Sequence, residues 1–189
     1  MPRRKSFNED EVLREIVQLF WRNGYAATAI DQICQHVSLS KPSIYNAYGD
    51  KATLFRKVVD WYADETGKQG LAILVGEAPV SEEIAALLRH YLVRPDHDVV
   101  SQGCLLTTTM MELQFSEPEI FGYIVKQTEQ VRDAIEEYFL TAVRHGRLNR
   151  DCDPGALSEY VFTLLQGLRV RSRTSSETAD LDRTITTAM

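Results

Sequence analysis

The chain has 189 residues, of which 44% are hydrophobic and 25% are charged, and its formal net charge is −6. This composition is typical of a folded globular protein and argues against intrinsic disorder. No stretch approaches the roughly 18 consecutive apolar residues of a membrane span, and no signal-peptide core follows the charged N-terminus, so we expect a cytoplasmic protein that does not bind membranes.

Charge is distributed unevenly along the chain. Residues 1–60 hold nine Lys or Arg and seven Asp or Glu, a net of +2, whereas residues 61–189 hold twelve and twenty, a net of −8. Because charge acts only over about 8 to 10 Å in physiological salt, the overall acidity does not exclude a local polyanion site. We expect any polyanion partner to bind the N-terminal third.

The cysteines and histidines do not predict a metal site. The three cysteines form an odd set without a CxxC pair, and the four histidines are scattered. Pro95 should interrupt any helix that would align His90 with His97. We therefore expect no disulfide framework, no metal ion and no other cofactor.

Three short helices are predicted before residue 50. Residues 9–23 have helical periodicity and end before Gly24, a residue type that often follows a helix. A second helix is expected after Thr28, which precedes Asp31 by three residues in a near match to a capping box. The apolar residues of these two helices are Val12, Ile16, Leu19 and Phe20, followed by Ile30, Ile33 and Val37.

The third helix is expected to begin after Ser40, a favourable N-cap, with Pro42 in its first turn, where the missing N–H costs nothing. It ends by Gly49, and Asp50 caps a longer helix over residues 51–67. Beyond residue 70, helical periodicity predicts further helices around residues 84–91, 103–113, 118–146, 153–170 and 180–189. No strand alternation occurs, so the predicted fold is all-α. The last pattern is still running at Met189, which leaves open whether that helix is complete.

The stretch "SKPSIYNAYGDK" (40–51) fits the second helix of a helix-turn-helix, which enters the major groove of DNA. Ser40 and Ser43 place short hydrogen-bonding groups at the helix tip, where free N–H groups favour a phosphate oxygen. Lys41 adds a charge there, and Tyr45 lies one turn further along. The alternative is that Tyr45 and Tyr48 are core aromatics beside solvated lysines, but the preceding two helices favour the DNA-binding interpretation.

The segment from about residue 8 to 62 resembles the DNA-binding domain of the tetracycline-repressor (TetR) family of bacterial transcriptional regulators. "FWRNGYAATAIDQICQHVSLSKPSIYNAYGDKATLF" follows that family's pattern nearly position by position. The resemblance implies a three-helix helix-turn-helix DNA-binding domain (1–50) and a C-terminal helical bundle (51–189) that dimerises and holds a small-molecule effector. It also implies a homodimer that binds a near-palindromic operator on double-stranded DNA and usually represses transcription.

Two positions depart from the family pattern. Gly is frequent where Ser38 stands, because the turn tends to need a positive φ, so Ser38 should cost on the order of 1 kcal/mol. Pro42 stands where Gly or Ala is frequent, so a DNA contact at that residue must be apolar, as with a thymine methyl.

The resemblance also implies roles for individual residues. Those expected to hold phosphates are Thr28, Tyr48 and Lys51. Those expected to face the groove are Ser40, Lys41, Pro42, Ser43, Tyr45 and Asn46. Arg3, Arg4 and Lys5 form either a basic arm that enters the minor groove or a solvated terminus.

In the C-terminal region, the helix at about 153–172 together with the terminal segment 179–189 is the predicted dimer interface, with an apolar stripe on the first of these whose alternative role is internal packing. This stripe comprises Leu157, Val161, Leu164, Leu165 and Leu168. The predicted effector pocket is lined by apolar and aromatic residues, each of which could instead be plain core. These are Trp61, Cys104, Met110, Met111, Phe115, Tyr123, Phe162 and Gln166.

Cys104 begins a predicted helix, where the pKa of a thiol is lowered. We therefore consider a second mode of regulation, in which Cys104 senses an electrophile or oxidant, beside the simpler role of a buried apolar residue. No histidine lies in a motif that would make Cys104 a catalytic nucleophile, so we do not expect an enzyme. A helical adaptor that binds acidic protein is a weaker alternative, and these residues do not distinguish a repressor from an activator.

Overall fold

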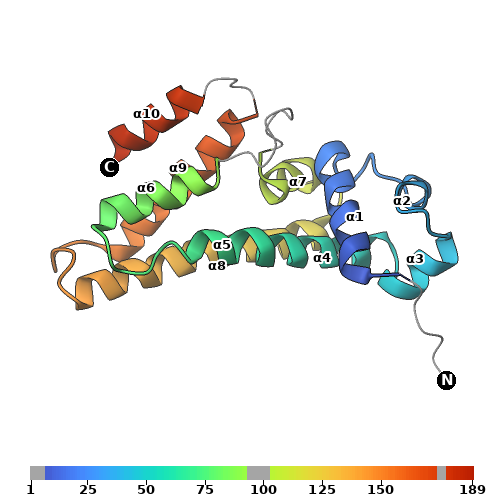
Figure 1. Cartoon of the computed structure of the whole chain (residues 1–189), viewed down its shortest axis with the longest axis horizontal. Helices are drawn as coiled ribbons and strands as arrows, with labels where there is room; N and C mark the ends of the chain where they lie inside the picture. Colours follow the sequence, from blue (N-terminus) through green and yellow to red (C-terminus); the bar gives the residue numbers. More distant parts are fainter. Residues whose placement is uncertain (1–6, 93–102, 174–177) are drawn as a thin grey trace.

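The computed structural model describes residues 7–92, 103–173 and 178–189, and within these ranges every regular element is helical. This result confirms the predicted all-α fold. The head, at one end of the molecule (Figure 1), is built from α1 (Glu9–Asn23), α2 (Ile30–His36) and α3 (Lys41–Tyr48). The body begins with α4 (Lys51–Tyr62), a π-helical segment η1 (Ala63–Gly67) and α5 (Lys68–Leu71). It continues with α6 (Val80–His90), α7 (Leu105–Leu113), α8 (Pro118–Arg144), α9 (Pro154–Arg171) and α10 (Thr178–Ala188).

Figure 1 shows how these helices are arranged. The long helix α8 runs along the body with α4 and α5 beside it, and α6 and α9 lie across it. Helix α10 lies at the end far from the head, and α7 lies next to α1. The body thus presents α4, α7 and the start of α8 to the head.

Local capping sets the ends of the head helices. Gly24, at φ 83°, donates its N–H to the carbonyl of Phe20 at 2.8 Å and ends α1. Ser40 Oγ accepts the N–H of Ser43 at 3.3 Å at the start of α3, as predicted. Asp50 accepts the N–H of Thr53 at 2.8 Å and begins α4, also as predicted.

The start of α2 differs from the prediction. The helix begins at Ile30, with Ala29 as the residue before it, and the N–H of Ala29 donates to Gln32 Oε1 at 2.8 Å. The predicted capping box assigned this contact to the side chain of Asp31. In the structure it is made by Gln32, the next residue in the chain.

The turn between α2 and α3 contains a residue with a positive φ, as the sequence predicts. Ser38 has φ 54°, the positive value at which glycine is favoured. Its N–H reaches the carbonyl of Gln35 at 3.4 Å, and the N–H of Leu39 reaches that of Cys34 at 3.0 Å. These bonds and the flanking helices hold the turn against its backbone strain.

The predicted helix over residues 51–67 is interrupted. Its last five residues form η1, in which each hydrogen bond spans one residue more than in an α-helix. After η1 the chain brings Gly70 against Tyr91, where an added Cβ would lie 2.3 Å from the tyrosine hydroxyl oxygen. A larger residue at position 70 would therefore require the Tyr91 side chain to move.

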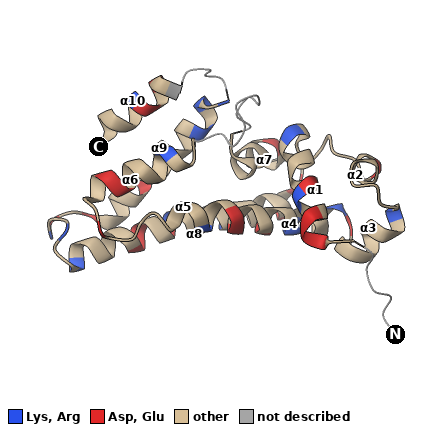
Figure 2. Ribbon diagram, in the orientation of Figure 1, with Lys and Arg blue, Asp and Glu red and all other residues tan. Residues whose placement is uncertain are grey.

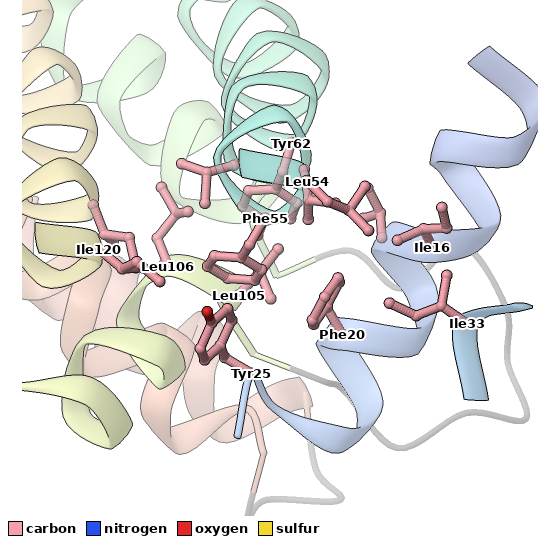
Figure 3. Packing of buried hydrophobic residues seen from close by; sticks show 14 of the residues in the cluster. Ile16, Phe20, Tyr25, Ile33, Leu54, Phe55, Tyr62, Leu105, Leu106 and Ile120 are labelled. Carbon is pink, nitrogen blue, oxygen red and sulfur yellow. The ribbon is translucent and has the colours of Figure 1, made fainter. Parts of the chain in front are cut away.

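The hydrophobic core of the head continues into the body. Phe20 of α1 and Phe55 of α4 meet with ring centroids 4.9 Å apart, and both side chains are fully buried. Leu105 and Leu106 of α7 and Ile120 of α8 belong to the same cluster (Figure 3). The predicted boundary near residue 50 therefore separates helices but does not separate cores.

A second cluster lies at the far end of the body, between α6, α8, α9 and α10. It contains three members of the predicted dimer stripe, Val161, Leu165 and Leu168, which are 3%, 0% and 2% exposed. The other two members, Leu157 and Leu164, are partly buried against the same cluster. Val161, Leu165 and Leu168 therefore have the alternative role of internal packing, which contradicts their assignment to the dimer interface, whereas the place of the partly buried Leu157 and Leu164 in an interface stays a prediction.

A buried carboxylate fixes the loop before α6. Glu83 Oε1 accepts the N–H groups of residues 76, 77 and 78 at 2.9, 2.9 and 3.2 Å. Its other oxygen accepts bonds from Tyr138 and, at 3.1 Å, from Arg147. Burial opposes the charge of Glu83, but these hydrogen bonds outweigh it and lower its pKa to about 2.

Candidate nucleic-acid interface

The outer face of α3 carries most of the side chains that the sequence predicts to meet DNA. Lys41, Pro42 and Asn46 are exposed, and Tyr45 is 48% exposed, whereas Ile44 points inward and is fully buried. Helix α3 lies at the outermost end of the head (Figure 1). These side chains are therefore accessible to a DNA groove while the helix stays folded, and their contact with DNA stays a prediction.

The two serines at the tip of α3 bond to each other. Ser40 Oγ and Ser43 Oγ lie 2.8 Å apart, in addition to the capping bond from the Ser43 N–H. The pair shapes the helix tip and leaves the remaining lone pairs and one hydroxyl hydrogen for a ligand.

Lys41 has an acidic neighbour. Its Nζ lies 2.6 Å from Asp31 Oδ1, and both side chains are more than half exposed. Asp31 raises the pKa of Lys41 through this hydrogen bond and through its charge. The pair joins α2 to α3, and blue and red ribbon segments lie close together on these helices in Figure 2. A phosphate that binds Lys41 must compete with Asp31.

Two of the three predicted phosphate ligands are contradicted by their burial. Thr28 is fully buried, and its hydroxyl donates to the carbonyl of Gly24 at 2.6 Å. Tyr48 is 3% exposed, and its hydroxyl donates to the carbonyl of Glu9 at 3.2 Å. Burial, with the charges of Glu9 and Asp10, raises the pKa of Tyr48 to about 12. Thr28 thus closes the loop after α1, and Tyr48 holds α3 against α1.

Lys51 remains a candidate phosphate ligand. Its Nζ lies 4.3 Å from the centroid of the Tyr25 ring and 3.5 Å from the carbonyl oxygen of Ala26. Partial burial lowers the pKa of Lys51, and Glu112 and Glu117 oppose this effect. The ammonium group adjoins exposed backbone at Ala26, where a phosphate oxygen can replace the weak carbonyl contact.

The basic arm of Arg3, Arg4 and Lys5 lies outside the described residues. Its predicted entry into the minor groove stays a prediction.

The predicted effector residues do not all line one pocket. Met111 is 71% exposed and Phe115 is 92% exposed, so both point away from the body, and their assignment to a pocket is wrong. Trp61, Met110 and Tyr123 pack partly buried against the core of the head. Gln166 accepts a hydrogen bond from the hydroxyl of Thr107 at 2.8 Å, and Phe162 is half-buried on the same helix.

Cys104 lies in a charged and aromatic cluster inside the body. The thiol is 2% exposed, and Arg169 Nη1 donates to its Sγ at 3.1 Å. The Arg169 guanidinium also lies 4.2 Å from the centroid of the Tyr91 ring. Among the salt bridges of the described residues, none joins Arg169 to a carboxylate, and one of its N–H groups donates to the sulfur of Cys104.

This environment changes the acidity of the thiol. Burial by itself raises the pKa of Cys104, but the charge of Arg169 and hydrogen bonds from Thr107 and Tyr62 lower it below its ordinary value. Cys104 is also the N-cap of α7, where the helix dipole favours negative charge. The predicted increase in thiolate character at the start of this helix therefore has a structural cause in α9 as well as in α7.

Sequence reasoning missed three charged residues at these sites. They are Asp31 beside Lys41, Arg169 beside Cys104, and Glu112, which binds the loop after α1. Each contact joins different elements of the fold, so no short-range spacing in the sequence marks it.

The described helices include none that is both long and apolar enough to cross a membrane. The same residues contain no group of three or more His, Cys, Asp or Glu that could hold a metal ion.

Two family profiles match the chain. Residues 12–58 match the family described as bacterial regulatory proteins, tetR family, and residues 81–188 match the family described as tetracyclin repressor-like, C-terminal domain. The two matches cover the head with most of α4, and the body from α6 onward.

Individual proteins agree with these matches. An uncharacterised HTH-type transcriptional regulator of Bacillus subtilis, YezE, is 29% identical over 97% of this chain and 93% of its own length. The HTH-type transcriptional repressor ComR of Escherichia coli is 23% identical over 90% of this chain and 82% of its own.

Solved structures show the same fold. The regulator CifR, in a cysteine mutant complexed with 26-bp operator DNA, has a TM-score of 0.90 at 24% identity, covering 98% of this chain and 97% of its own. The reduced form of E. coli NemR has a TM-score of 0.83 at 15% identity, covering 95% and 93%. The relatives that these comparisons find are transcriptional regulators, which confirms the prediction that the chain is not an enzyme.

Proposed function

The chain belongs to the TetR family of helix-turn-helix transcriptional regulators, and from this premise we propose that it represses transcription by binding a near-palindromic operator as a homodimer. The observation that carries the proposal is the exposed outer face of α3 on a head whose inner face is fully buried. A DNA-binding role places its site of action with the chromosome, in the cytoplasm. An activator would use the same interface, and the position of the operator relative to the promoter distinguishes the two.

We assign different tasks to the exposed side chains of the head. Lys51 and Lys41 carry positive charge that suits phosphate contacts, which position the protein without reading sequence. Tyr45, Asn46 and Pro42 present groups that suit base edges and thymine methyls in the major groove. Ser40 and Ser43 suit either partner.

For the homodimer we propose a different face of α9 from the buried stripe. Every side chain on this face is exposed, and the residues recur at steps of four and three, which aligns them along one side of the helix. They are Ala156, Tyr160, Thr163, Gly167 and Val170. Tyr160 and Val170 are 50% and 48% exposed, and the space beside Gly167 is open. Small residues flanked by larger apolar ones suit close approach of a symmetry-related helix.

The experiment that tests the proposal is selection of bound DNA from a random pool, followed by affinity measurements on the selected sequence. We expect a palindrome whose half-sites lie about one helical turn apart, roughly 34 to 36 Å. Binding should weaken steeply as salt rises, and a scrambled site should bind much less tightly. Enrichment of no sequence, or of a single half-site without symmetry, would contradict the homodimeric repressor.

Regulation by a small-molecule effector follows from the same premise. An effector that binds the body lowers DNA affinity by its differential affinity for two arrangements of the heads, and α4 directly joins head and body. The internal helices of the body are the region where we place its binding site.

A thiol-based sensor is a second candidate for regulation, and one observation favours it. The buried guanidinium of Arg169 lies 3.1 Å from the Cys104 sulfur. Addition of an electrophile at Sγ would replace the ionisable thiol that faces Arg169 with an uncharged thioether and would add volume to a packed core.

The test uses protein in which Cys34 and Cys152 are replaced by Ser, because both are more exposed than Cys104. N-ethylmaleimide should lower operator affinity about tenfold or more in this protein and leave it unchanged when Cys104 is also replaced by Ser. Complete alkylation of Cys104 with unchanged operator affinity would exclude this second candidate.

A further inference from the structure

A carboxylate of the body holds a loop of the head. Glu112, near the C-terminal end of α7, accepts the N–H of Tyr25 with Oε2 at 2.9 Å and the N–H of Ala26 with Oε1 at 2.7 Å. Both oxygens are therefore used on two consecutive N–H groups of the loop between α1 and α2. The contact spans 87 and 86 residues of sequence.

The loop is shaped to receive this carboxylate. Gly24, which precedes the two N–H groups, has φ +83°, and an added Cβ would lie 2.8 Å from Glu112 Oε2. In this conformation a side chain at residue 24 would crowd the carboxylate. The positive φ of Gly24, which ends α1, thus also leaves room for Glu112 beside the two N–H groups.

A second charged group, on a different helix, contacts the same loop. Lys51, the first residue of α4, faces the Tyr25 ring at 4.3 Å and the Ala26 carbonyl at 3.5 Å. The charge of Glu112 acts on Lys51. The loop is therefore held by α4 through its ring and carbonyl, and by α7 through its N–H groups.

The opposite end of α7 meets α9. Cys104, the N-cap of α7, accepts a bond from Arg169, and Thr107 donates to Gln166 at 2.8 Å. A helix of nine residues spans about 13 Å. Helix α7 is thus a short, rigid connection between the interior of the body and the loop of the head.

We propose that Glu112 is a positioning residue for DNA binding, because it fixes the orientation of the head on the body. Through the contact of Glu112 with the loop, α7 transmits conformational changes of the body to the head. The inference rests on the proposed function, because head orientation matters only if two heads must match two half-sites. In a dimer a small rotation of each head changes the distance between the two α3 helices, which must stay near one DNA turn. Loss of Glu112 leaves the head joined to the body by α4 and the apolar core, but with greater orientational freedom.

A purely structural role for Glu112 would have a different signature. It would lower stability and would weaken binding to every operator by the same factor. A positioning role instead predicts that loss of Glu112 weakens the discrimination between half-site spacings, and this signature distinguishes the two roles.

The experiment measures operator affinity for a series of sites in which one or two base pairs are inserted or deleted between the half-sites. The variants are Glu112→Ala and Glu112→Gln, and the matched control is Glu129→Ala, which removes an exposed glutamate from α8. Wild type and control should lose about tenfold or more in affinity per base pair of altered spacing, because misplaced half-sites forfeit contacts of one head. Glu112→Ala should bind the best site several-fold more weakly and should flatten this profile to about twofold per base pair. Glu112→Gln keeps one acceptor oxygen and should be intermediate.

Amide hydrogen exchange supplies a readout that does not depend on DNA. In Glu112→Ala the amides of Tyr25 and Ala26 should both exchange at least tenfold faster than in wild type, and in Glu112→Gln at least one of them should, while amides within α1 and α3 keep their protection. If Glu112→Ala does not fold, Glu112→Gln carries both measurements.

The outcomes separate the two proposals. If wild type discriminates spacing and the Glu112 variants show the same profile, the positioning role is overturned and the repressor stands. If the variants weaken binding equally at all spacings, Glu112 is structural and the positioning role is again overturned. If wild type shows no sequence-selective binding, the proposed function fails, and the positioning role fails with it.

Discussion

At the scale of single residues, neighbours determine which of the polar groups in the head are free to bind DNA. Tyr45 and Tyr48 have the same chemistry and lie three positions apart, yet one is 48% exposed and the other 3%. Tyr48 follows Ile44 by four residues and shares its buried side of α3, whereas Tyr45 lies on the outward side. The alternative of a core aromatic, weighed from the sequence for both, is correct for Tyr48 only.

The Lys41–Asp31 pair leads to a prediction about affinity. Replacement of Asp31 by Asn removes a competitor of phosphate for the Lys41 ammonium and removes a negative charge near the DNA. We expect DNA affinity to increase about threefold at low salt, within the range of an exposed ion pair, and the gain to diminish as salt rises. Fluorescence anisotropy with operator and scrambled DNA measures it.

Glu11→Gln, which removes an exposed charge from the first turn of α1, is the matched control. An affinity gain as large as that of Asp31→Asn would assign the effect to general charge rather than to release of Lys41.

The Glu83 network leads to a prediction about pH. The pKa of Glu83 is about 2 in the folded protein, against its ordinary value of 4.5, so its ionised form stabilises the fold. This stabilisation is present above about pH 4.5 and is lost as pH falls toward 2. Urea denaturation between these pH values should show a smaller loss of unfolding free energy in Glu83→Gln than in wild type.

At neutral pH, Glu83→Gln should itself be less stable by about 3 kcal/mol, because Arg147 loses its charged partner and loop N–H groups lose an acceptor. Parallel stability curves of the two proteins from pH 6 to pH 2 would refute the assignment to Glu83.

At the scale of helices, α9 shows that the most apolar stripe of a helix need not be its dimer interface. Its most regular apolar residues fill the core of a single chain, and its exposed face is made of smaller and mixed residues. Gly167 lies on that exposed face, and a Cβ added to it would have no other group within 4 Å. A glycine in a helix interior lowers stability by about 1 kcal/mol relative to alanine, and close contact with a second helix would offset this cost.

Gly167→Arg therefore tests the proposed dimer interface. The side chain has open space in the isolated chain, so folding should be retained, but it would block close approach of a symmetry-related α9. We expect the dimer dissociation constant to increase at least a hundredfold, measured by analytical ultracentrifugation.

Gly122→Arg is the matched control, because Gly122 is also exposed on a helix with open space beside it. Dissociation caused by Gly122→Arg and not by Gly167→Arg would move the interface to the first half of α8.

At the scale of the whole molecule, DNA binding must be a local property, because the chain carries a net charge of −6. The body holds most of the negative charge, while the candidate phosphate ligands lie on α3 and at the start of α4. Screening over about 8 Å at physiological salt separates the two. The acidic body then disfavours non-specific association outside the head.

Lys51→Ala should show this local effect in the salt dependence of binding. Removal of one phosphate contact should weaken binding to all sequences by a similar factor and should reduce the slope of log K against log salt by about 1. Asn46→Ala should instead alter sequence preference and leave the slope unchanged. Titrations at four salt concentrations with operator and scrambled DNA distinguish the two, and an exchange of these behaviours would contradict the assigned tasks.

The sequence by itself determined most of the helices, several of their ends and the family. Periodicity predicted α1, α4 and the helices from α6 to α10, Ser40 and Asp50 cap the helices that they were predicted to cap, and Ser38 has its expected positive φ. These features are local, since they depend on hydrogen bonds and steric limits within a few residues.

Only the tertiary structure decided what covers each face. A stripe of apolar residues predicts burial but does not say whether the same chain or a second copy buries it, so Val161, Leu165 and Leu168 were assigned to an interface although they lie in the core of one chain. The burial of Thr28 and Tyr48 and the exposure of Met111 and Phe115 likewise depend on which helices pack over them, and the local sequence does not specify this. The contacts of Glu112 and Arg169 join helices far apart in sequence, and their geometry arises only when the whole core has packed.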